Sequence, residues 1–501
     1  MILVSRTFTP GWPFVVAVLG LSACVSTPPR SVSGAPSVAP APAEPWAAPS
    51  AAGAPLKPAE TRPANRPAPP AADPVHKLDR LFLADVVDLA LGNSPLTKAS
   101  WAQARAAAAT VGSARGRYLP TLSVDATGGP SQVISANPAR LPAERTVLNT
   151  SASLQWLLFD FGARGGAMTA AREGLFAADL THNATVQNVV LEAESAYFTY
   201  QAYRGLLQAS QATVQTAQTN LAAAQRRHDV GLATIADVLQ AQTALAQAQL
   251  TEQTAESNVQ TARASLALAI GVAPNAAFEA GDEPESAQAY TITESVDSLI
   301  ARAERSRPDV AAARALARQS EAQVRVARSL TLPTMIFGAT TGRSFANIPA
   351  LEGRTYGLSV GFSFPIFNGL TRQYDVVAAQ ENAAAAVARA DQARLQAAAQ
   401  VFSSYYALRT AAQRIATATD LLASATRSEE VARGRYAEGV GSVLDLLTAQ
   451  SALADARAQA VQARWTWYAT FAQLARDAGV LDTRGGMRLT STAGPAVRSN
   501  P

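Results

Sequence analysis

Alternation of apolar and polar residues predicts two β-hairpins in this chain. A period of two over about ten residues is typical of a strand that buries one face. Such stretches lie at about 119–130 and 147–159, and again at about 332–343 and 355–367. In the last stretch, Tyr356, Leu358, Val360, Phe362 and Phe364 alternate with Thr355, Gly357, Ser359, Gly361 and Ser363. Loops at 131–146 and 344–354 separate the two strands of each hairpin.

Two long helical segments follow each hairpin. No proline interrupts the segments at about 163–229 and 371–436, and a glycine break separates each from a second segment, at about 234–270 and 442–478. At 1.5 Å per residue the longer segments reach roughly 100 Å, whereas an ordinary helix has about 11 residues. Recurring alanines permit close helix approach, and we expect a coiled-coil assembly. These alanines are Ala241, Ala244, Ala246, Ala248, Ala449, Ala452, Ala454 and Ala456.

The hairpin and helix unit occurs twice. Leu-Pro-Thr steps at 119–121 and 332–334 are 213 residues apart, as are Pro95 and Pro308. Beyond the hairpins the offset is 208 residues; it relates Phe159 to Phe367, Tyr197 to Tyr405, Gly231 to Gly439 and Asp237 to Asp445. Two constant offsets with one change of five residues indicate a tandem duplication. The change falls in the hairpin region, most simply in its loop.

The apolar strand faces require partners. Two isolated hairpins, one with Trp156 and the other with Phe362 and Phe364, would be marginally stable in water. Four strands are too few for a transmembrane barrel, which needs about eight. After the N-terminus no stretch of about 18 apolar residues occurs, so a spanning structure would be a closed barrel. We therefore expect oligomerisation, and three chains would supply twelve strands. A lipid-anchored structural coiled coil of the envelope, without transport, is the alternative from another class.

The N-terminus resembles that of an exported lipoprotein. Residues 1–23 contain a basic start, a short apolar run and small residues, as in a signal peptide. The only cysteine, Cys24, ends a Leu-Ser-Ala-Cys sequence that resembles a lipobox, which implies cleavage before Cys24 and its lipidation. Residues 24–75 are rich in proline and alanine and predict a semi-extended tether. Residues 482–501 are expected to be a disordered tail.

Composition and motifs give no support to catalysis. The formal charge is +4, without a lysine and arginine cluster, which does not suggest nucleic-acid binding. The three histidines, His76, His182 and His228, have no metal-ligand spacing. We find no phosphate-binding loop and no nucleophile and base pairing. We therefore expect no metal, no cofactor and no enzyme activity. Trp465, Trp467 and Tyr468 are expected to pack between helices.

The order of these elements resembles the TolC family of outer membrane factors. The matching sequences are Arg227-His228-Asp229-Val230-Gly231-Leu232-Ala233-Thr234-Ile235-Ala236-Asp237-Val238-Leu239 and Arg435-Tyr436-Ala437-Glu438-Gly439-Val440-Gly441-Ser442-Val443-Leu444-Asp445-Leu446-Leu447. The resemblance implies a mixed α and β membrane protein with tandem repeats at 76–290 and 291–481. It implies a homotrimer in which a twelve-stranded outer membrane β-barrel continues into a long periplasmic α-helical coiled-coil barrel.

The resemblance also implies a function. The chain would be a trimeric outer membrane channel of a tripartite efflux system, a passive exit duct for drugs or small solutes. An inner-membrane pump of the resistance-nodulation-division type would drive it, together with a periplasmic adaptor protein. The alternative within the class is the exit duct of a type I protein secretion system.

Two aspartates are candidates for the pore gate. Asp237 and Asp445 stand three residues after Thr234 and Ser442, which is the spacing of a capping box. Helix capping alone explains the presence of both aspartates, without a gate. By resemblance, Asp445 would also form a ring of three carboxylates at the periplasmic entrance, where repulsion raises pKa values and cations are attracted. Thr448 and Gly441 depart from the family's second carboxylate ring and linking arginine. Leu444 or Leu447 could then close the pore instead.

Three further features belong to the candidate gate region. Tyr436 either ties the closed helices together through its hydroxyl or packs between them. The glycines of the two turns have helix C-caps as their local explanation. The resemblance implies that the turns dock the adaptor, through Gly231, Leu232, Ala233, Gly439, Val440 and Gly441.

Overall fold

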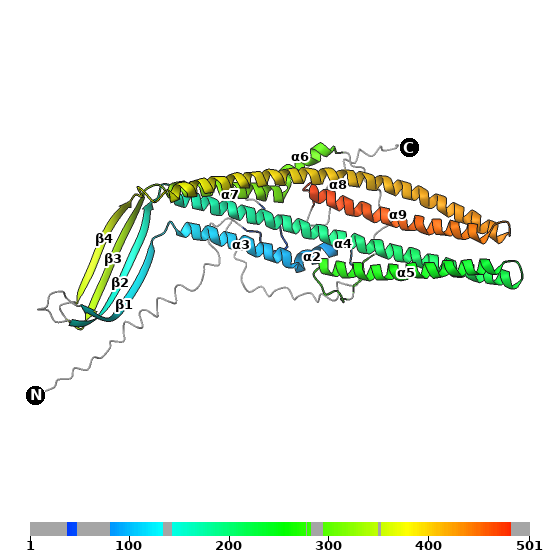
Figure 1. Ribbon diagram of the computed structural model, residues 1–501, viewed down its shortest axis with the longest axis horizontal. Helices are drawn as coiled ribbons and strands as arrows, with labels where there is room; N and C mark the ends of the chain where they lie inside the picture. Colours follow the sequence, from blue (N-terminus) through cyan, green and yellow to red (C-terminus); the bar gives the residue numbers. More distant parts are fainter. Residues whose placement is uncertain are drawn as a thin grey trace, which may run out of the picture.

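A four-stranded sheet stands at one end of a long helical body. The computed structural model describes residues 38–47, 81–133, 143–276, 278–281, 294–348 and 352–481. Figure 1 shows the sheet at one end and two helical hairpin tips at the other. The longest helices, α4 (Ala163–Asp229) and α8 (Thr371–Ala437), leave the sheet and run to the tips. The fold therefore separates the strands from the tips by roughly 100 Å.

The described helices of the two halves correspond one to one. Each half carries helices of 11, 22, 67 and 35 residues in the same order. Helices α4 and α8 have the bounds expected from the proline-free segments to within one residue. The remaining helices are α2 (Leu83–Asn93), α3 (Pro95–Gly116), α5 (Ile235–Ala269), α6 (Val296–Ser306), α7 (Pro308–Ser329) and α9 (Val443–Asp477).

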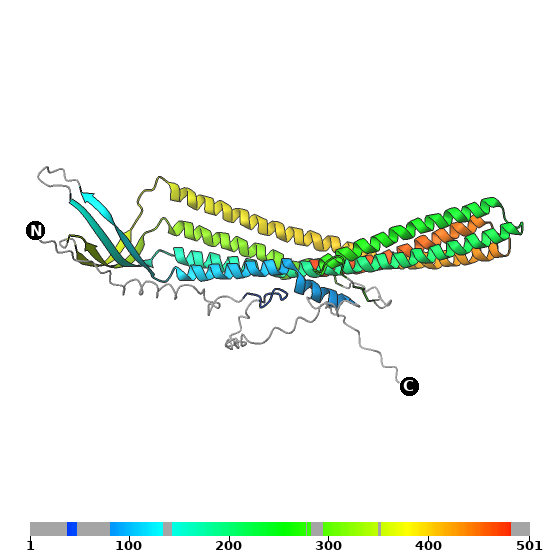
Figure 2. The same cartoon turned by 90° about the horizontal axis from the view of Figure 1, so that it is seen from below.

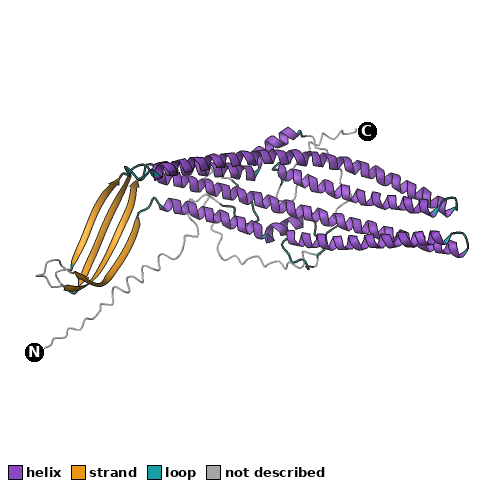
Figure 3. Cartoon of the chain, in the orientation of Figure 1, coloured by secondary structure: helices purple, strands orange, loops and turns teal. Residues whose placement is uncertain are grey.

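The predicted hairpins join into one antiparallel sheet of order β1-β2-β3-β4. Figure 3 shows the four strands together, set apart from the helices. The strands are β1 (Thr121–Val133), β2 (Ala143–Phe159), β3 (Thr334–Ala346) and β4 (Gly353–Ser363). The edges β1 and β4 lack a neighbouring strand in this sheet. An unpaired edge leaves a row of N–H and C=O groups open to further strands.

The strand registers locate the five-residue difference between the halves. Ser131 pairs with Arg145 in the first hairpin, and the corresponding Ser344 pairs with Gly353 in the second. Thirteen residues separate the first pair and eight the second. The difference therefore lies at the closed end of the hairpin, as the sequence indicated.

Strand β4 ends earlier than the alternation predicts. It stops at Ser363, although apolar residues continue through Phe364 and Phe367. Pro365 has no N–H for the sheet ladder and restricts the residue before it. The prediction of a strand to about 367 is therefore wrong by four residues.

Two consecutive left-handed residues immediately precede each long helix. Phe161 (φ +50°) and Gly162 (φ +96°) precede α4, and Gly369 (φ +66°) and Leu370 (φ +65°) precede α8. Glycine tolerates this conformation, whereas each non-glycine residue costs about 1 kcal/mol or more. The two left-handed residues thus stand at corresponding positions in both halves, where the chain passes from the sheet into the helical body (Figure 2).

The core lies midway along the helical body. There α2 packs on α4, and one hydrophobic cluster extends from these helices to the end of α5; it includes Leu81, Val86, Tyr197, Leu266 and Ile270. The short helix α6 packs on α8 and α9, where Trp467 is buried and Trp465 and Tyr468 are half-buried, as expected. Toward the tips small alanine seams replace this core. Ala241, Ala248, Ala449 and Ala456 are buried, whereas Ala246 and Ala452 are exposed in the single chain.

Residues 38–47 correct the prediction of an unpacked tether. Trp46 is buried, its ring lies 5.8 Å from that of Phe176, and its N–H and C=O both bond the Asn183 amide. The carbonyl of Ala39 accepts a hydrogen bond from the Trp101 indole. The prediction is wrong here because one large aromatic and a few backbone bonds suffice to dock a short proline-rich segment.

Several predictions fall outside the described residues. These are the signal peptide at 1–23, lipidation of Cys24, the remainder of the 24–75 tether, the tail at 482–501 and most of the first hairpin loop. Across the described ranges, none of the helices combines the length and apolarity that a membrane crossing requires.

Candidate functional site

The two helical hairpin tips have nearly identical backbones. Gly231 and Gly439 adopt φ of +74° and +76° after α4 and α8. The next amides, of Leu232 and Val440, reach back to carbonyl oxygens five residues earlier, at 2.7 and 2.9 Å. This is the Schellman geometry of a helix C-cap. The prediction that Gly231 and Gly439 form helix C-caps is therefore confirmed. Docking of an adaptor at these turns stays a prediction.

The tips expose apolar side chains. Leu232 and Val440 are each about 70% exposed, at 71% and 69%. Gly231 and Gly439 are also exposed, and Ala233 and Gly441 are half-buried. Each tip thus presents apolar area to the solvent.

Both candidate gate aspartates cap their own helices. The Oδ2 atom of Asp237 accepts hydrogen bonds from the Thr234 N–H at 2.8 Å and hydroxyl at 2.9 Å. Asp445 accepts from the Ser442 N–H at 3.3 Å, and its own N–H donates to the Ser442 hydroxyl at 3.1 Å. The predicted capping boxes are confirmed in both halves. Asp445 is exposed and Asp237 is half-buried.

The neighbouring leucines differ in exposure. Leu444 is 60% exposed at the start of α9, whereas Leu447 is half-buried. Leu446, between them, is buried. Leu444 and Asp445 are therefore the two candidate gate residues that α9 presents most openly.

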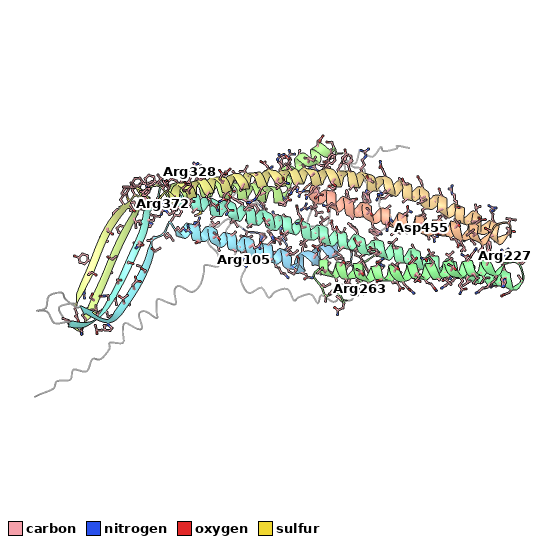
Figure 4. The ribbon with its side chains drawn as sticks, in the orientation of Figure 1. Arg105, Arg227, Arg263, Arg328, Arg372 and Asp455 are labelled. Atoms are coloured by element: carbon pink, nitrogen blue, oxygen red, sulfur yellow. The ribbon has the colours of Figure 1, made fainter. Side chains whose placement is uncertain are left out.

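Arg227 joins the two hairpins, and the sequence did not single it out. Its Nη1 donates a hydrogen bond to the Tyr436 carbonyl at 2.6 Å, and its guanidinium lies 4.7 Å from the Tyr436 ring centroid. Figure 4 labels Arg227 near the tips. The Tyr436 hydroxyl is buried without a hydrogen-bond partner in the described chain. Within the single chain, Arg227 contacts the ring and the carbonyl of Tyr436, and a tie through the Tyr436 hydroxyl stays a prediction.

A second link lies two turns further from the tips. Asn220 of α4 donates to Gln450 of α9 at 2.5 Å, and Gln450 donates to buried Glu429 of α8 at 3.4 Å. Arginine and asparagine at these positions are common in helices, so only the tertiary packing of α4 against α8 and α9 identifies them.

Buried acids occur in α4 far from the tips. Burial raises the pKa of Asp179 and of Glu194 to about 7. Both Asp179 carboxylate oxygens and Glu194 Oε2 are buried without a hydrogen-bond partner. Burial also lowers the pKa of His182, which contacts Ser100 at 2.8 Å and the Glu44 carbonyl at 3.0 Å. These groups belong to the middle of the body, where residues 38–47 dock.

The described residues contain no group of three or more histidine, cysteine, aspartate or glutamate side chains that could hold a metal ion. The geometry at the tips consists of capped helix ends, exposed leucine and valine, and carboxylates. Such an arrangement can bind a partner or restrict passage, and it lacks the paired groups of a catalytic centre.

Comparison with known proteins identifies the family. The outer membrane efflux protein family matches residues 86–272 and 299–480. Protein CyaE of Bordetella pertussis is 32% identical over 394 residues, which cover 78% of this chain and 82% of that protein. Outer membrane protein TolC of Escherichia coli is 25% identical over 70% of this chain and 74% of its own.

Solved structures show the same fold at low identity. A CusC structure has a TM-score of 0.73 and 18% identity, covering 80% of this chain and 93% of that one. A membrane protein of Pseudomonas aeruginosa has a TM-score of 0.72 and 23% identity, covering 83% and 98%. The family match spans most of the chain and includes both helical hairpins. The chain belongs to the outer membrane efflux protein family.

Proposed function

We propose that three copies of this chain form one channel, a passive exit duct across the outer membrane. Members of the family are efflux channels and not enzymes. Twelve strands would close into one β-barrel, and the helices of the three copies, two tandem repeats in each, would continue it as a tunnel through the periplasm. The cargo would be drugs or other small solutes. An inner-membrane pump would drive it, with a periplasmic adaptor protein.

The single observation that supports this assembly is the sheet. It has two free edges, β1 and β4, and one face with exposed apolar residues, among them Leu122, Val124, Leu358 and Phe362. Lipid leaves no partner for an open edge, and three such sheets joined edge to edge would leave none open. The opposite face, with Ser123, Ser153 and Ser359, would line the lumen.

We propose that the channel closes at the tips of α8 and α9. Three copies would bring Asp445 and Leu444 around one axis, with Leu447 behind them and Asp237 on the neighbouring hairpin. Arg227 would hold the second hairpin in the closed position through Tyr436. Opening would then break one charged hydrogen bond and one cation–π contact in each copy.

The same tips would dock the adaptor. Leu232 and Val440 supply exposed apolar area. The small residues Gly231, Ala233, Gly439 and Gly441 would allow the adaptor to approach the backbone closely. Cys24, with its lipobox, would anchor each copy to the outer membrane, which intact mass of the full-length protein can test.

Native mass spectrometry combined with planar-bilayer recording tests the proposal. The full-length protein purified in detergent should have the mass of three chains and should give discrete conductance steps. A monomer, or a trimer without conductance at any voltage, would favour a structural coiled coil of the envelope instead.

A further inference from the structure

The strand registers place a layered series of side chains on the apolar face of the sheet. Directly opposite residues share a face, so each level can be followed across β2, β3 and β4. Moving away from the helices, the levels are Trp156, Phe337, Val360; Leu154, Ala339, Leu358; Ala152, Thr341, Tyr356; Thr150, Arg343, Arg354; and Leu148, Phe345. The face is thus apolar near the helices and basic close to its far end.

Arg343 and Arg354 form a direct cross-strand pair of like charges. Both side chains are exposed, and the Arg343 guanidinium lies 4.6 Å from the Phe345 ring centroid. Like charges in this position destabilise a sheet. The ion pairs among the described residues include neither arginine, although Glu352 lies two residues before Arg354.

The neighbouring strand would not neutralise this pair either. In the proposed ring, β4 of one copy lies beside β1 of the next. On this face β1 presents Leu122, Val124, Ala126 and Gly128, set by their pairing with β2. Asp125 falls on the opposite face. None of the four strands thus places a carboxylate at the level of the pair, where Ala126 and Thr150 stand beside the two arginines, and this leaves the guanidinium groups open to an anion from outside the protein.

The level of the pair along the strands identifies its surroundings. Arg343 lies six residues beyond Phe337, roughly 20 Å along β3. Leucine and alanine side chains occupy the first level between, and Ala152, Thr341 and Tyr356 the next, which is the order of a lipid-facing band and its polar border. With the helices in the periplasm, an orientation that rests on the proposed function, the arginines lie at the outer leaflet.

We propose that Arg343 and Arg354 bind a phosphate group of the phosphorylated glycolipid in the outer leaflet. Guanidinium groups match phosphate oxygens in bidentate geometry, and one phosphate can neutralise both charges. Tyr356 below the pair and Phe345 and Leu148 above it supply apolar surface for the sugar and acyl chains. The Thr150 hydroxyl donates to the Arg343 carbonyl at 3.2 Å, which holds the strand position. Lipid binding would replace repulsion with attraction at one level of each sheet.

The test compares two lipids on the full-length detergent-purified protein. One is purified lipopolysaccharide, and the other is the same lipid with its phosphates removed by hydrofluoric acid. The wild type should bind the phosphorylated lipid more tightly than the other. R343Q/R354Q should lose this preference, because each guanidinium group contributes about tenfold to it. R389Q/R409Q, which removes two exposed arginines of α8, should keep it.

Thermal unfolding measured without lipid shows whether the variant has a folding defect. R343Q/R354Q should be at least as stable as the wild type, because the repulsion is gone, and should gain no stability from the phosphorylated lipid. R343K/R354K should recover part of the preference.

Three results would overturn the inference: equal binding of the two lipids by the wild type, an unchanged preference in R343Q/R354Q, or loss of the preference in millimolar inorganic phosphate, which would show a site for free anions. Conductance recorded from the same preparations shows whether the proposed channel function also fails. A protein that conducts but gives one of these three results contradicts the lipid site alone.

Discussion

Arg227 and Tyr436 are joined by two contacts at once, one to the backbone and one to the ring. The Arg227 Nη1 donates to the Tyr436 carbonyl at 2.6 Å, and the guanidinium lies 4.7 Å from the ring centroid. The same carbonyl accepts the capping bond from the Gly439 N–H at 3.2 Å. Arg227 therefore lies at the negative end of α8, where a cation is favoured. One side chain of the first hairpin thus holds the end of the second.

Replacing Arg227 with Gln should open the channel more often. The lost hydrogen bond and cation–π contact contribute about 1–2 kcal/mol in each copy, which changes the closed-to-open ratio roughly tenfold for each copy that opens. Planar-bilayer recording of purified protein measures this as a higher open fraction. R226Q, at the exposed neighbouring arginine, removes the same charge and should record as wild type. Equal effects of the two variants would exclude Arg227 as the latch.

Asp445→Ala should raise conductance and weaken block by divalent cations, because it removes the proposed carboxylate ring. Asp237→Ala is the matched control, since both residues complete the same capping box. Each substitution costs about 1 kcal/mol of helix stability. Only Asp445→Ala should alter block. An unchanged channel in that variant would move the constriction to Leu444 or Leu447.

Stability should fall as the pH rises toward 7, in part because of Glu194. Burial raises the pKa of Glu194 to about 7, so the folded state holds a proton that the unfolded state loses near its ordinary pKa. This contribution is complete below about pH 4 and is lost as the pH rises through 7.

Glu194→Gln should consequently stabilise the protein at pH 8, on the order of 2 kcal/mol, and have little effect near pH 4.5. Thermal unfolding at both pH values gives the comparison. Glu192→Gln, at an exposed position of the same helix, should show no such pH dependence. A benefit of Glu194→Gln that is equal at both pH values would contradict the buried-acid explanation.

Trp46→Ala should weaken the docking of residues 38–47. Loss of a buried tryptophan ring costs about 3 kcal/mol, and here the lost packing includes the edge contact with Phe176. Chemical denaturation of the full-length protein would report it. Trp46→Phe keeps an aromatic ring and should retain most of the stability. If Trp46→Ala unfolds like the wild type, the segment contributes nothing to the body.

The sequence predicted the elements far better than their contacts. Proline-free stretches bounded by glycine define α4 and α8 to within one residue, because Gly162, Gly231, Gly369 and Gly439 supply left-handed residues where these helices begin and end. Alternation found all four strands but extended β4 past Pro365, since apolar residues continue where the sheet ladder cannot. Trp46 was missed because a proline-rich segment offers no periodicity that could reveal docking.

The site was predicted in part. The capping roles of Asp237 and Asp445 follow from local spacing alone, so they could be recognised without the fold. Arg227 acts on a residue 209 positions away, and only tertiary packing brings the two together. The pairing of Arg343 with Arg354 likewise depends on the hairpin register, which the length of the loop determines.

Cysteine substitution at Asp445 tests whether three second hairpins converge around one pore. In D445C, three thiols should meet at the closed entrance. Disulfide-linked chains should then appear on a non-reducing gel, and cadmium ions should block a conductance that a chelator restores. D237C is the control and should show much weaker block. A conducting trimer of D445C with neither cross-link nor cadmium block would contradict a gate formed by α9.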